Sequence, residues 1–254
     1  MEQDVEELKN NGEFSTIGCQ YTLMYMARLY SQSEFLSFKV LSLIGNLFSE
    51  YEASQVIEAF AIKTLCDWEW YCEKMICECL QLDTTNLSNH LELKLPKEIS
   101  TDECIAYLNG LGYFDLKNVS NLKFISKKIL VEKLNPFVKI NSDAIKHIDD
   151  YYIIRNYIAH KSNKSKKSLM TAYNRNGQKT FIEAGEFLLS KKSKYETELR
   201  IQYFEGSFWL STYNILEFLY PKTYNWIVRD EEIYNDNCHK RFLKLLELSP
   251  NKPK

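Results

Sequence analysis

Glycine and proline are scarce in this chain of 254 residues, which contains 8 Gly and 5 Pro. Sheets joined by many hairpins need these residues at their tight turns, whereas long helices do not. The shortage therefore predicts an all-α fold. The chain also lacks a glycine-rich loop of the kind that holds triphosphates, which argues against nucleoside-triphosphate hydrolysis.

Long apolar runs are absent as well. The most apolar segment, Val40 to Ile44, is far shorter than the ~20 residues that span a bilayer. No signal peptide is recognisable, and the seven Cys are an odd number at irregular spacing. These features predict a soluble, cytoplasmic protein with reduced thiols and no membrane partner.

The sequence has neither a net positive charge nor a recognisable spacing of metal ligands. The formal net charge of −2 argues against a general coat for nucleic acid, so any RNA contact must come from a local patch. Cys72, Cys77 and Cys79 share one predicted helix, but their spacing is not that of paired zinc ligands. We expect core thiols, no metal site and no cofactor.

Apolar residues recur at helical spacing along most of the sequence. We expect an acidic, polar and frayed start over 1–12, a polar loop over 83–99 and a segment of mixed pattern over 161–196. The expected helices cover 21–30, 33–80 with a break between Gly45 and Glu50, 100–110, 121–134, 142–160, 197–219 and 224–248. Together they form a single all-α domain over 1–254.

Two local patterns support these helices. The long helix carries the three-and-four spacing of an amphipathic helix at Val56, Ala59, Ile62, Cys66 and Trp70. The helix over 100–110 opens with a capping-box pattern, in which a Ser is followed three residues later by a Glu.

The most informative stretch is Arg155-Asn156-Tyr157-Ile158-Ala159-His160, called the Arg–His motif below. It ends a patterned helix and precedes the lysine-rich segment 161–168. An imidazole moves protons near neutral pH, and a guanidinium holds phosphate through a fork of donors. The motif therefore predicts phosphodiester chemistry without a metal.

Helical geometry constrains how the motif works. Ile148, Tyr151, Ile154 and Ile158 form a stripe expected to be buried, whereas Asn156 and His160 are stacked neighbours on another face. Residues five apart are offset by roughly 140°. Arg155 and His160 can therefore meet only through a long reach, a loosened helix end or a second copy of the helix.

Arg155-Asn156-x-x-x-His160, at the end of a late helix, resembles the Arg-x4-His motif of the HEPN superfamily, including its RiboL-PSP-like ribonuclease and toxin domains. The upstream segment 59–70 strengthens the resemblance, because many members carry an aromatic–Glu pair on an early helix. The similarity covers residues 34–220, an expected helical-bundle core, with 221–254 as a C-terminal helix.

The resemblance implies a homodimeric, metal-independent endoribonuclease, often a toxin or an effector of bacterial antiviral defence. Arg155 and His160 would be catalytic, Asn156 would be the polar residue after the Arg, and Glu69 would be a supporting carboxylate. An antitoxin or sensor protein could accompany it. One branch carries a Tyr two residues beyond the His as the target of an antitoxin. That position is Ser162 here, so this mechanism is not supported.

The expected reaction is attack of the RNA 2′-hydroxyl on the adjacent phosphorus. His160 would move the proton, and Arg155 would stabilise charge on the phosphate oxygens. Flanking phosphates would be held by Lys161, Lys164, Lys166 and Lys167, and unpaired bases would stack on Tyr173 and Arg175.

Two other interpretations remain open. One is a non-catalytic HEPN module that binds RNA, nucleotide or a partner protein. The other is a helical scaffold whose aromatic faces recruit another subunit. A basic residue in a last helical turn also suits the helix dipole, and a lysine run is often a solvated loop.

Overall fold

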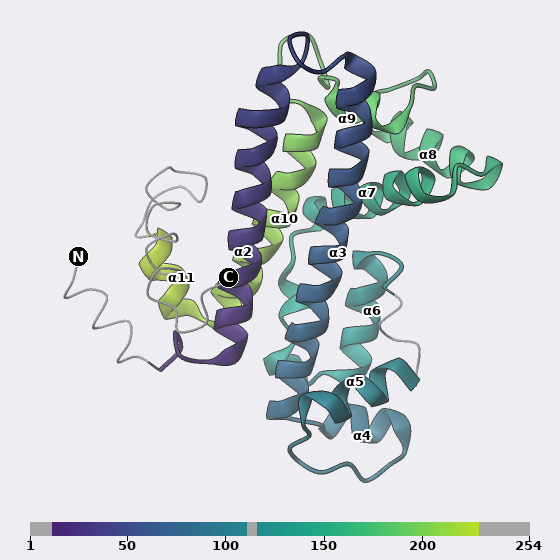
Figure 1. The fold of residues 1–254 in the computed structure, drawn as a ribbon. Helices are drawn as coiled ribbons and strands as arrows, with labels where there is room; N and C mark the ends of the chain where they lie inside the picture. Colours follow the sequence, from purple (N-terminus) through teal and green to yellow (C-terminus); the bar gives the residue numbers. More distant parts are fainter. Residues whose placement is uncertain (1–11, 111–115, 229–254) are drawn as a thin grey trace. The chain divides into compact units, whose positions relative to one another are not determined.

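The computed structural model of the chain describes residues 12–110 and 116–228, and all of its regular elements are helical (Figure 1). No β-strand occurs in these residues. This confirms the all-α class. The frayed start expected for residues 1–12 lies almost wholly outside the described residues.

The helices follow one another with short connections. A π-helical turn over Phe35–Val40 and a 3-10 turn over Leu41–Leu43 follow the first helix, and two further 3-10 turns, Glu132–Leu134 and Pro136–Lys139, precede α7. The α-helices are α2 (Ile17–Glu34), α3 (Glu50–Leu82), α4 (Thr85–Leu91), α5 (Thr101–Gly110), α6 (Val119–Ile129), α7 (Ser142–His160), α8 (Asn163–Arg175), α9 (Ala184–Leu189), α10 (Arg200–Leu219) and α11 (Pro221–Val228).

Contacts between residues divide the chain into two compact units. The first unit takes residues from Met1–Ala27, Glu69–Asn141 and Leu210–Lys254, and the second from Arg28–Trp68 and Ser142–Trp209. Helices α2, α3 and α10 contribute residues to both units. The single domain over 1–254 and the HEPN-like core stay predictions.

The first unit has a core of aromatic rings and thiols. Tyr25 on α2 stacks on Tyr71 on α3, with ring centroids 4.6 Å apart. Helices α4, α5 and α6 gather beside the end of α3 (Figure 1), where the Sγ atoms of Cys77 and Cys104 are 2.9 Å apart. Cys72 and Cys79 are buried too. The cysteine cluster of α3 is therefore part of the core, as expected.

The second unit is built around α7. Of its expected buried stripe, Ile148, Tyr151 and Ile154 are fully buried, whereas Ile158 is only half-buried. The Tyr151 ring contacts Phe204 and Phe208 of α10, with centroid distances of 5.4 and 5.5 Å. This packing fixes α7 along most of its length and leaves its last turn for the surface.

The register expected for α3 is wrong. Ala59, Ile62 and Cys66 are exposed, and Val56 and Trp70 are only half-buried. The apolar residues buried on this part of the helix instead include Ala53, Ile57, Ala61, Leu65 and Trp68. Both sets have helical spacing, because apolar residues occur on more than one side of α3. Spacing alone could not select the buried side.

Several boundaries also differ from expectation. The segment expected as a loop over 83–99 contains α4, and α6 ends at Ile129 because Leu130 already adopts an extended conformation. The mixed segment over 161–196 contains α8 and α9. Most of the helix expected over 224–248 lies outside the described residues. The capping box is confirmed, since Ser100 and Glu103 exchange hydrogen bonds.

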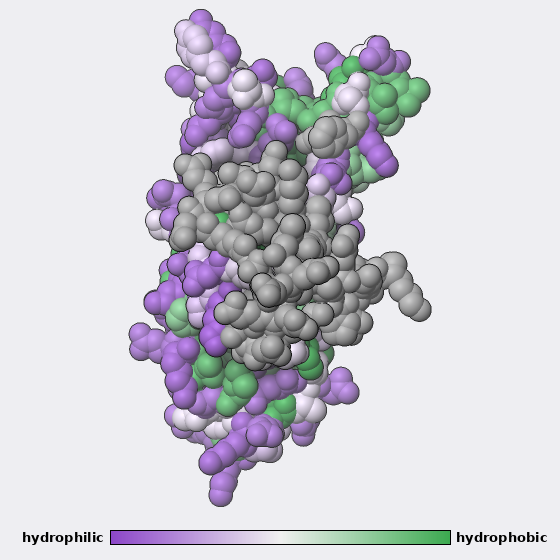
Figure 2. Space-filling view, turned by 90° about the vertical axis from the view of Figure 1, so that its left-hand side faces the viewer, coloured by the Kyte–Doolittle hydropathy of each residue, from purple (hydrophilic) through white to green (hydrophobic). Residues whose placement is uncertain are grey.

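Figure 2 shows hydrophilic residues over much of the coloured surface, with smaller hydrophobic clusters between them. Among the described helices, none is long and apolar enough to cross a membrane.

Candidate functional site

The Arg–His motif occupies the last two turns of α7, and a sharp turn follows it. The Lys161 amide donates to the Tyr157 carbonyl at 2.8 Å, which completes the last helical hydrogen bond. Lys161 then adopts a φ of 42°, in the left-handed region that commonly ends helices. The turn places His160 as the last residue of α7, with an exposed side chain.

Helix α8 begins immediately after this turn. Ser162 is its N-cap, and Ser162 and Ser165 exchange backbone-to-side-chain hydrogen bonds of 3.1 and 3.0 Å. Only residues 161 and 162 connect the two helices, which contact each other. The lysine run is therefore mostly helical, and it starts at the end of the motif.

Arg155 is half-buried, and its guanidinium carbon lies 5.6 Å from the centroid of the Tyr152 ring. Helix α7 is regular through His160, so no loosened helix end brings the two motif residues together. Their offset of roughly 140° around the helix persists. Within one chain the structure does not stack Arg155 on His160.

Asn156 and His160 are better placed to act together. They are four residues apart on one regular helix, so their side chains are neighbours. Asn156 is half-buried and His160 is exposed. A ligand can therefore reach the imidazole from solvent, with the Asn156 amide beside it.

Two carboxylates lie beside the turn that follows His160, and the sequence did not single them out. The Nζ of Lys161 is 3.8 Å from Oε2 of Glu58 and 3.7 Å from Oε2 of Glu183. Glu58 is buried, and its Oε1 accepts from the Gly185 amide at 3.2 Å. Lys161 is thus a paired cation, rather than the open phosphate ligand that we expected.

Close helix packing explains the burial of Glu58. A Cβ added at Gly185 would lie 2.2 Å from the Ser54 carbonyl oxygen, so only glycine fits where α9 meets α3. This approach brings the Gly185 amide to the Glu58 carboxylate. A Gly at the start of a short helix was the one sequence signal for this contact.

Tyr157, the central tyrosine of the motif, extends the cluster. Its hydroxyl lies 3.3 and 3.4 Å from the two carboxylate oxygens of Glu183. Burial and the Glu183 carboxylate raise the pKa of Tyr157 above its ordinary value. The Tyr157 hydroxyl is therefore the hydrogen-bond donor to Glu183, and this contact supports the last turn of α7.

The other expected phosphate ligands are accessible. Lys164, Lys166 and Lys167 are exposed on the first turns of α8, and the Lys166 ammonium lies 3.5 Å from the centroid of the Phe181 ring. An exposed cation–π contact of this kind contributes about 0.5–1 kcal/mol, which a phosphate contact can replace. These three lysines remain candidates.

The two expected base-stacking residues fare differently. The prediction for Tyr173 is wrong, because its ring is fully buried and stacks on Phe187 with a centroid distance of 4.0 Å. Arg175 is exposed, but its Nε donates to Oδ1 of the buried Asp150 at 2.9 Å. This ion pair ties Arg175 to α7, which weakens the case for a role in binding bases.

Glu69 is half-buried on α3 and belongs to the first unit, whereas the motif belongs to the second. Its role as a supporting carboxylate stays a prediction. His147 is fixed by two hydrogen bonds of 3.1 Å, one between Nδ1 and the Ser207 hydroxyl and one between Nε2 and the Tyr203 hydroxyl. Burial lowers the pKa of His147, and the nearby Lys192 adds to this.

No group of three His, Cys, Asp or Glu side chains suitable for a metal ion occurs in residues 12–110 and 116–228. Comparison of the chain with family models, curated proteins and solved structures finds no match. A function for this chain can therefore be proposed only from its own residues and from the resemblance of the Arg–His motif.

Proposed function

We propose that this chain is a metal-independent endoribonuclease whose active site is the last two turns of α7. The observation that carries the proposal is the accessible pair of Asn156 and His160, with the half-buried Arg155 preceding it. The three exposed lysines of α8 lie directly after this pair in the chain. A base, a phosphate ligand and a cationic track thus occur in one segment.

In the proposed reaction, His160 accepts the proton of an RNA 2′-hydroxyl as that oxygen attacks the adjacent phosphorus. The bond to the 5′-oxygen of the next nucleotide breaks, and the products are a 2′,3′-cyclic phosphate and a 5′-hydroxyl. The departing oxygen takes up a proton. An imidazole suits both transfers, because its unperturbed pKa is about 6.5.

Arg155 stabilises the negative charge that develops on the phosphate oxygens, an effect of about 3 kcal/mol for a well-placed donor. The regularity of α7 separates Arg155 from His160 of the same chain, so we propose a homodimer in which α7 of each chain faces the other. Arg155 of one chain then serves His160 of its partner. The role of a toxin or defence effector follows from the HEPN resemblance.

The first test measures cleavage of a mixed cellular RNA pool in EDTA by the wild type, Arg155→Ala and His160→Ala. We expect each substitution to lower the rate by roughly 10²-fold or more, and the wild-type products to carry cyclic phosphates. His90→Ala is the matched control, because His90 is exposed on α4 in the first unit. Equal cleavage by all variants would contradict the proposal.

Mixing the two inactive variants tests the dimer directly. A mixed dimer contains one intact pair, with Arg155 from one chain and His160 from the other. We expect part of the activity to return on mixing. If each chain uses its own pair, mixing restores nothing. Circular dichroism and sedimentation check that both variants keep their helicity and their association.

A specific observation also favours the alternative of a non-catalytic binding module. Arg155 and His160 lie on different sides of a regular helix, and such residues can bind a ligand without acting on one phosphate. Salt-sensitive RNA binding without cleavage, weakened by Lys164→Ala and Lys167→Ala, would support this alternative.

A further inference from the structure

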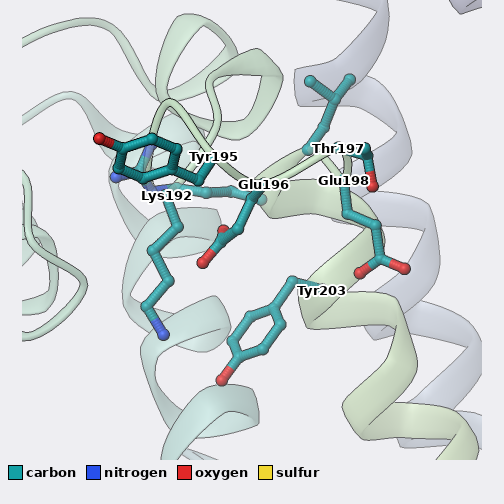
Figure 3. A pocket seen from close by; sticks show the side chains of 8 residues that line it. Lys192, Tyr195, Glu196, Thr197, Glu198 and Tyr203 are labelled. Carbon is teal, nitrogen blue, oxygen red and sulfur yellow. The ribbon is translucent and has the colours of Figure 1, made fainter.

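A second candidate site lies far from the Arg–His motif, within the second unit. It is a pocket of about 350 Å³, a volume in the range that holds small ligands. Figure 3 shows that its walls come from one loop and from the first turn of α10. The lining residues are Lys192, Tyr195, Glu196, Thr197, Glu198, Leu199, Arg200 and Tyr203.

The loop is closed at its base. Lys191 and Leu199 form an antiparallel bridge, and the Arg200 amide donates to the Ser190 carbonyl at 2.9 Å. The buried Arg200 guanidinium also donates to the Lys191 carbonyl at 2.6 Å. Compact loops with tied ends often carry function. This one holds its side chains over the start of α10.

Tyr203 forms a preorganised aromatic wall. Its hydroxyl is hydrogen-bonded to His147 at 3.1 Å, and the His147 ring lies 4.7 Å from the Tyr203 ring. His147 is held in turn by Ser207. The Tyr203 side chain is nevertheless 36% exposed, so one part of it stays open to a ligand. A fixed, accessible ring is what base stacking needs.

Cations accompany both tyrosines of the pocket. The Lys192 ammonium lies 4.8 Å from the centroid of Tyr203, and the Lys194 ammonium lies 4.9 Å from that of Tyr195. Alternation of aromatic rings with cations is typical of surfaces that stack a base and hold its phosphate. Of the two basic residues that line the pocket, Arg200 is buried against backbone carbonyls, so Lys192 is the cation that a phosphate can reach.

The Glu196 carboxylate lies between the side chains of Lys192 and Tyr203 in Figure 3. An ionised carboxylate only accepts hydrogen bonds, so it selects a base edge that donates them. Guanine presents an imino N–H and an amino group side by side, which match the two oxygens. Uracil presents one N–H between two carbonyl oxygens, which a carboxylate repels.

We propose that this pocket binds a guanine nucleotide, with the base on Tyr203 and against Glu196 and the phosphate at Lys192. In the unliganded chain the Lys192 ammonium covers the ring. A cation–π contact at an exposed site is weaker than stacking of a base on the same ring. The base therefore displaces Lys192, which turns to the phosphate.

This site goes beyond the proposed nuclease centre and does not depend on it. His147, which supports Tyr203, precedes His160 by thirteen residues on α7, a separation of ~20 Å along the helix. A chain that binds GMP and cuts no RNA would refute the nuclease and leave the pocket standing. A chain that cuts RNA and ignores GMP would do the reverse.

The test titrates the full chain with GMP, guanosine and UMP. Binding is followed by calorimetry or by NMR shifts of the backbone amides in the loop. We expect GMP to bind roughly tenfold or more tightly than UMP, because a bidentate pair to a base edge discriminates by at least this much. Tyr203→Ala should weaken GMP binding roughly tenfold or more, whereas Tyr203→Phe, which keeps the ring, should weaken it far less. Glu196→Ala should abolish the preference for GMP over UMP.

Lys192→Ala should remove the advantage of GMP over guanosine and reduce the salt dependence of binding. Tyr51→Ala and Lys97→Ala are matched controls, because both residues are exposed and lie outside the pocket lining. A guanine-containing single-stranded oligonucleotide that binds in place of GMP, with the same variant pattern, assigns the site to RNA. The proposal is overturned if neither GMP nor the oligonucleotide shows saturable binding, or if Tyr203→Ala leaves binding unchanged.

Discussion

The two units of this protein bury different kinds of polar group. The buried polar side chains of the first unit are all uncharged, within the described residues: Gln20, Thr22, Thr84, Ser126, Asn135, Ser211, Thr212 and Thr223. The second unit buries Glu58, Asp67, Asp150, Arg200 and Glu205. Every buried charged residue that the structure describes is therefore in the unit that carries the Arg–His motif and the pocket.

Buried charge is not an efficient way to stabilise a fold, since well-packed apolar residues often serve as well. Its concentration in one unit therefore needs another reason. Asp67 accepts from Arg28 and Gln32, at 3.2 and 2.6 Å, and Asp150 accepts from Arg175 and Asn176. The Asp67 contacts tie α3 to α2, and the Asp150 contacts tie α7 to the end of α8. We infer that the second unit keeps charges inside because its helices must hold a defined geometry.

Glu205 should show the largest effect. Its carboxylate is buried, with one bond of 3.2 Å from the Ser33 hydroxyl, and burial raises its pKa from 4.5 to about 7. In the folded chain it takes up a proton that the unfolded chain releases. Its contribution to stability is thus full below pH 4.5 and is lost as the pH rises through about 7. The loss amounts to about 3 kcal/mol.

Urea unfolding of the wild type and Glu205→Gln between pH 4.5 and pH 8 measures this effect. Gln keeps the shape of the side chain and stays neutral. The free energy of unfolding of the variant should therefore rise relative to that of the wild type as the pH rises. Parallel stability curves for the two proteins would show that Glu205 does not titrate in this range. The comparison of the two units would then lose its strongest case.

Asp150→Ala and Thr22→Val compare the two units at matched burial. Loss of Asp150 leaves the buried Asn176 amide and the exposed Arg175 without their carboxylate, and we expect the free energy of unfolding to fall by about 2 kcal/mol. Thr22 bonds to the Gly18 carbonyl and the Tyr71 hydroxyl at 3.0 and 3.1 Å, and its loss should cost about 1 kcal/mol. If chemical denaturation gives equal losses of stability for the two variants, the proposed difference between the units is wrong.

The sequence predicted the helices better than their faces. Few glycines and regular apolar spacing were enough for the all-α class, and the stripe of α7 was correct at Ile148, Tyr151 and Ile154. On α3 the same method chose the wrong side, because Ile62 and Cys66 are apolar residues that face solvent. Spacing identifies a helix, whereas burial depends on what packs against it.

In the candidate site too, local features could be predicted from the sequence and tertiary contacts could not. Its local part, the stacked pair of Asn156 and His160, follows from helical geometry and could be predicted. The partners of Lys161 could not, since Glu58 and Glu183 are more than twenty residues away in sequence. Tyr173 resembled a base-stacking residue on a basic segment, yet α9 supplies Phe187 to cover it. Tertiary contacts decided each of these cases.

The smallest expected effect concerns the turn after His160, where charge and backbone strain oppose each other. Lys161 has a φ of 42°, which is unfavourable by about 1 kcal/mol for a residue other than glycine. Its half-exposed ion pairs with Glu58 and Glu183 contribute about 0–1 kcal/mol. Lys161→Gly removes both terms and should leave stability within about 0.5 kcal/mol of the wild type.

Lys161→Ala separates these two terms, because alanine loses the ion pairs and keeps the strain. We expect it to be less stable than Lys161→Gly by about 1 kcal/mol in urea unfolding. Glu58→Gln removes the charge of the buried partner, while its amide oxygen still accepts from Gly185. This variant should therefore lose no more stability than Lys161→Ala. An alanine variant more stable than the glycine variant would mean that α7 does not end in a left-handed turn. The exposed position of His160 at the end of α7 would then need a different explanation.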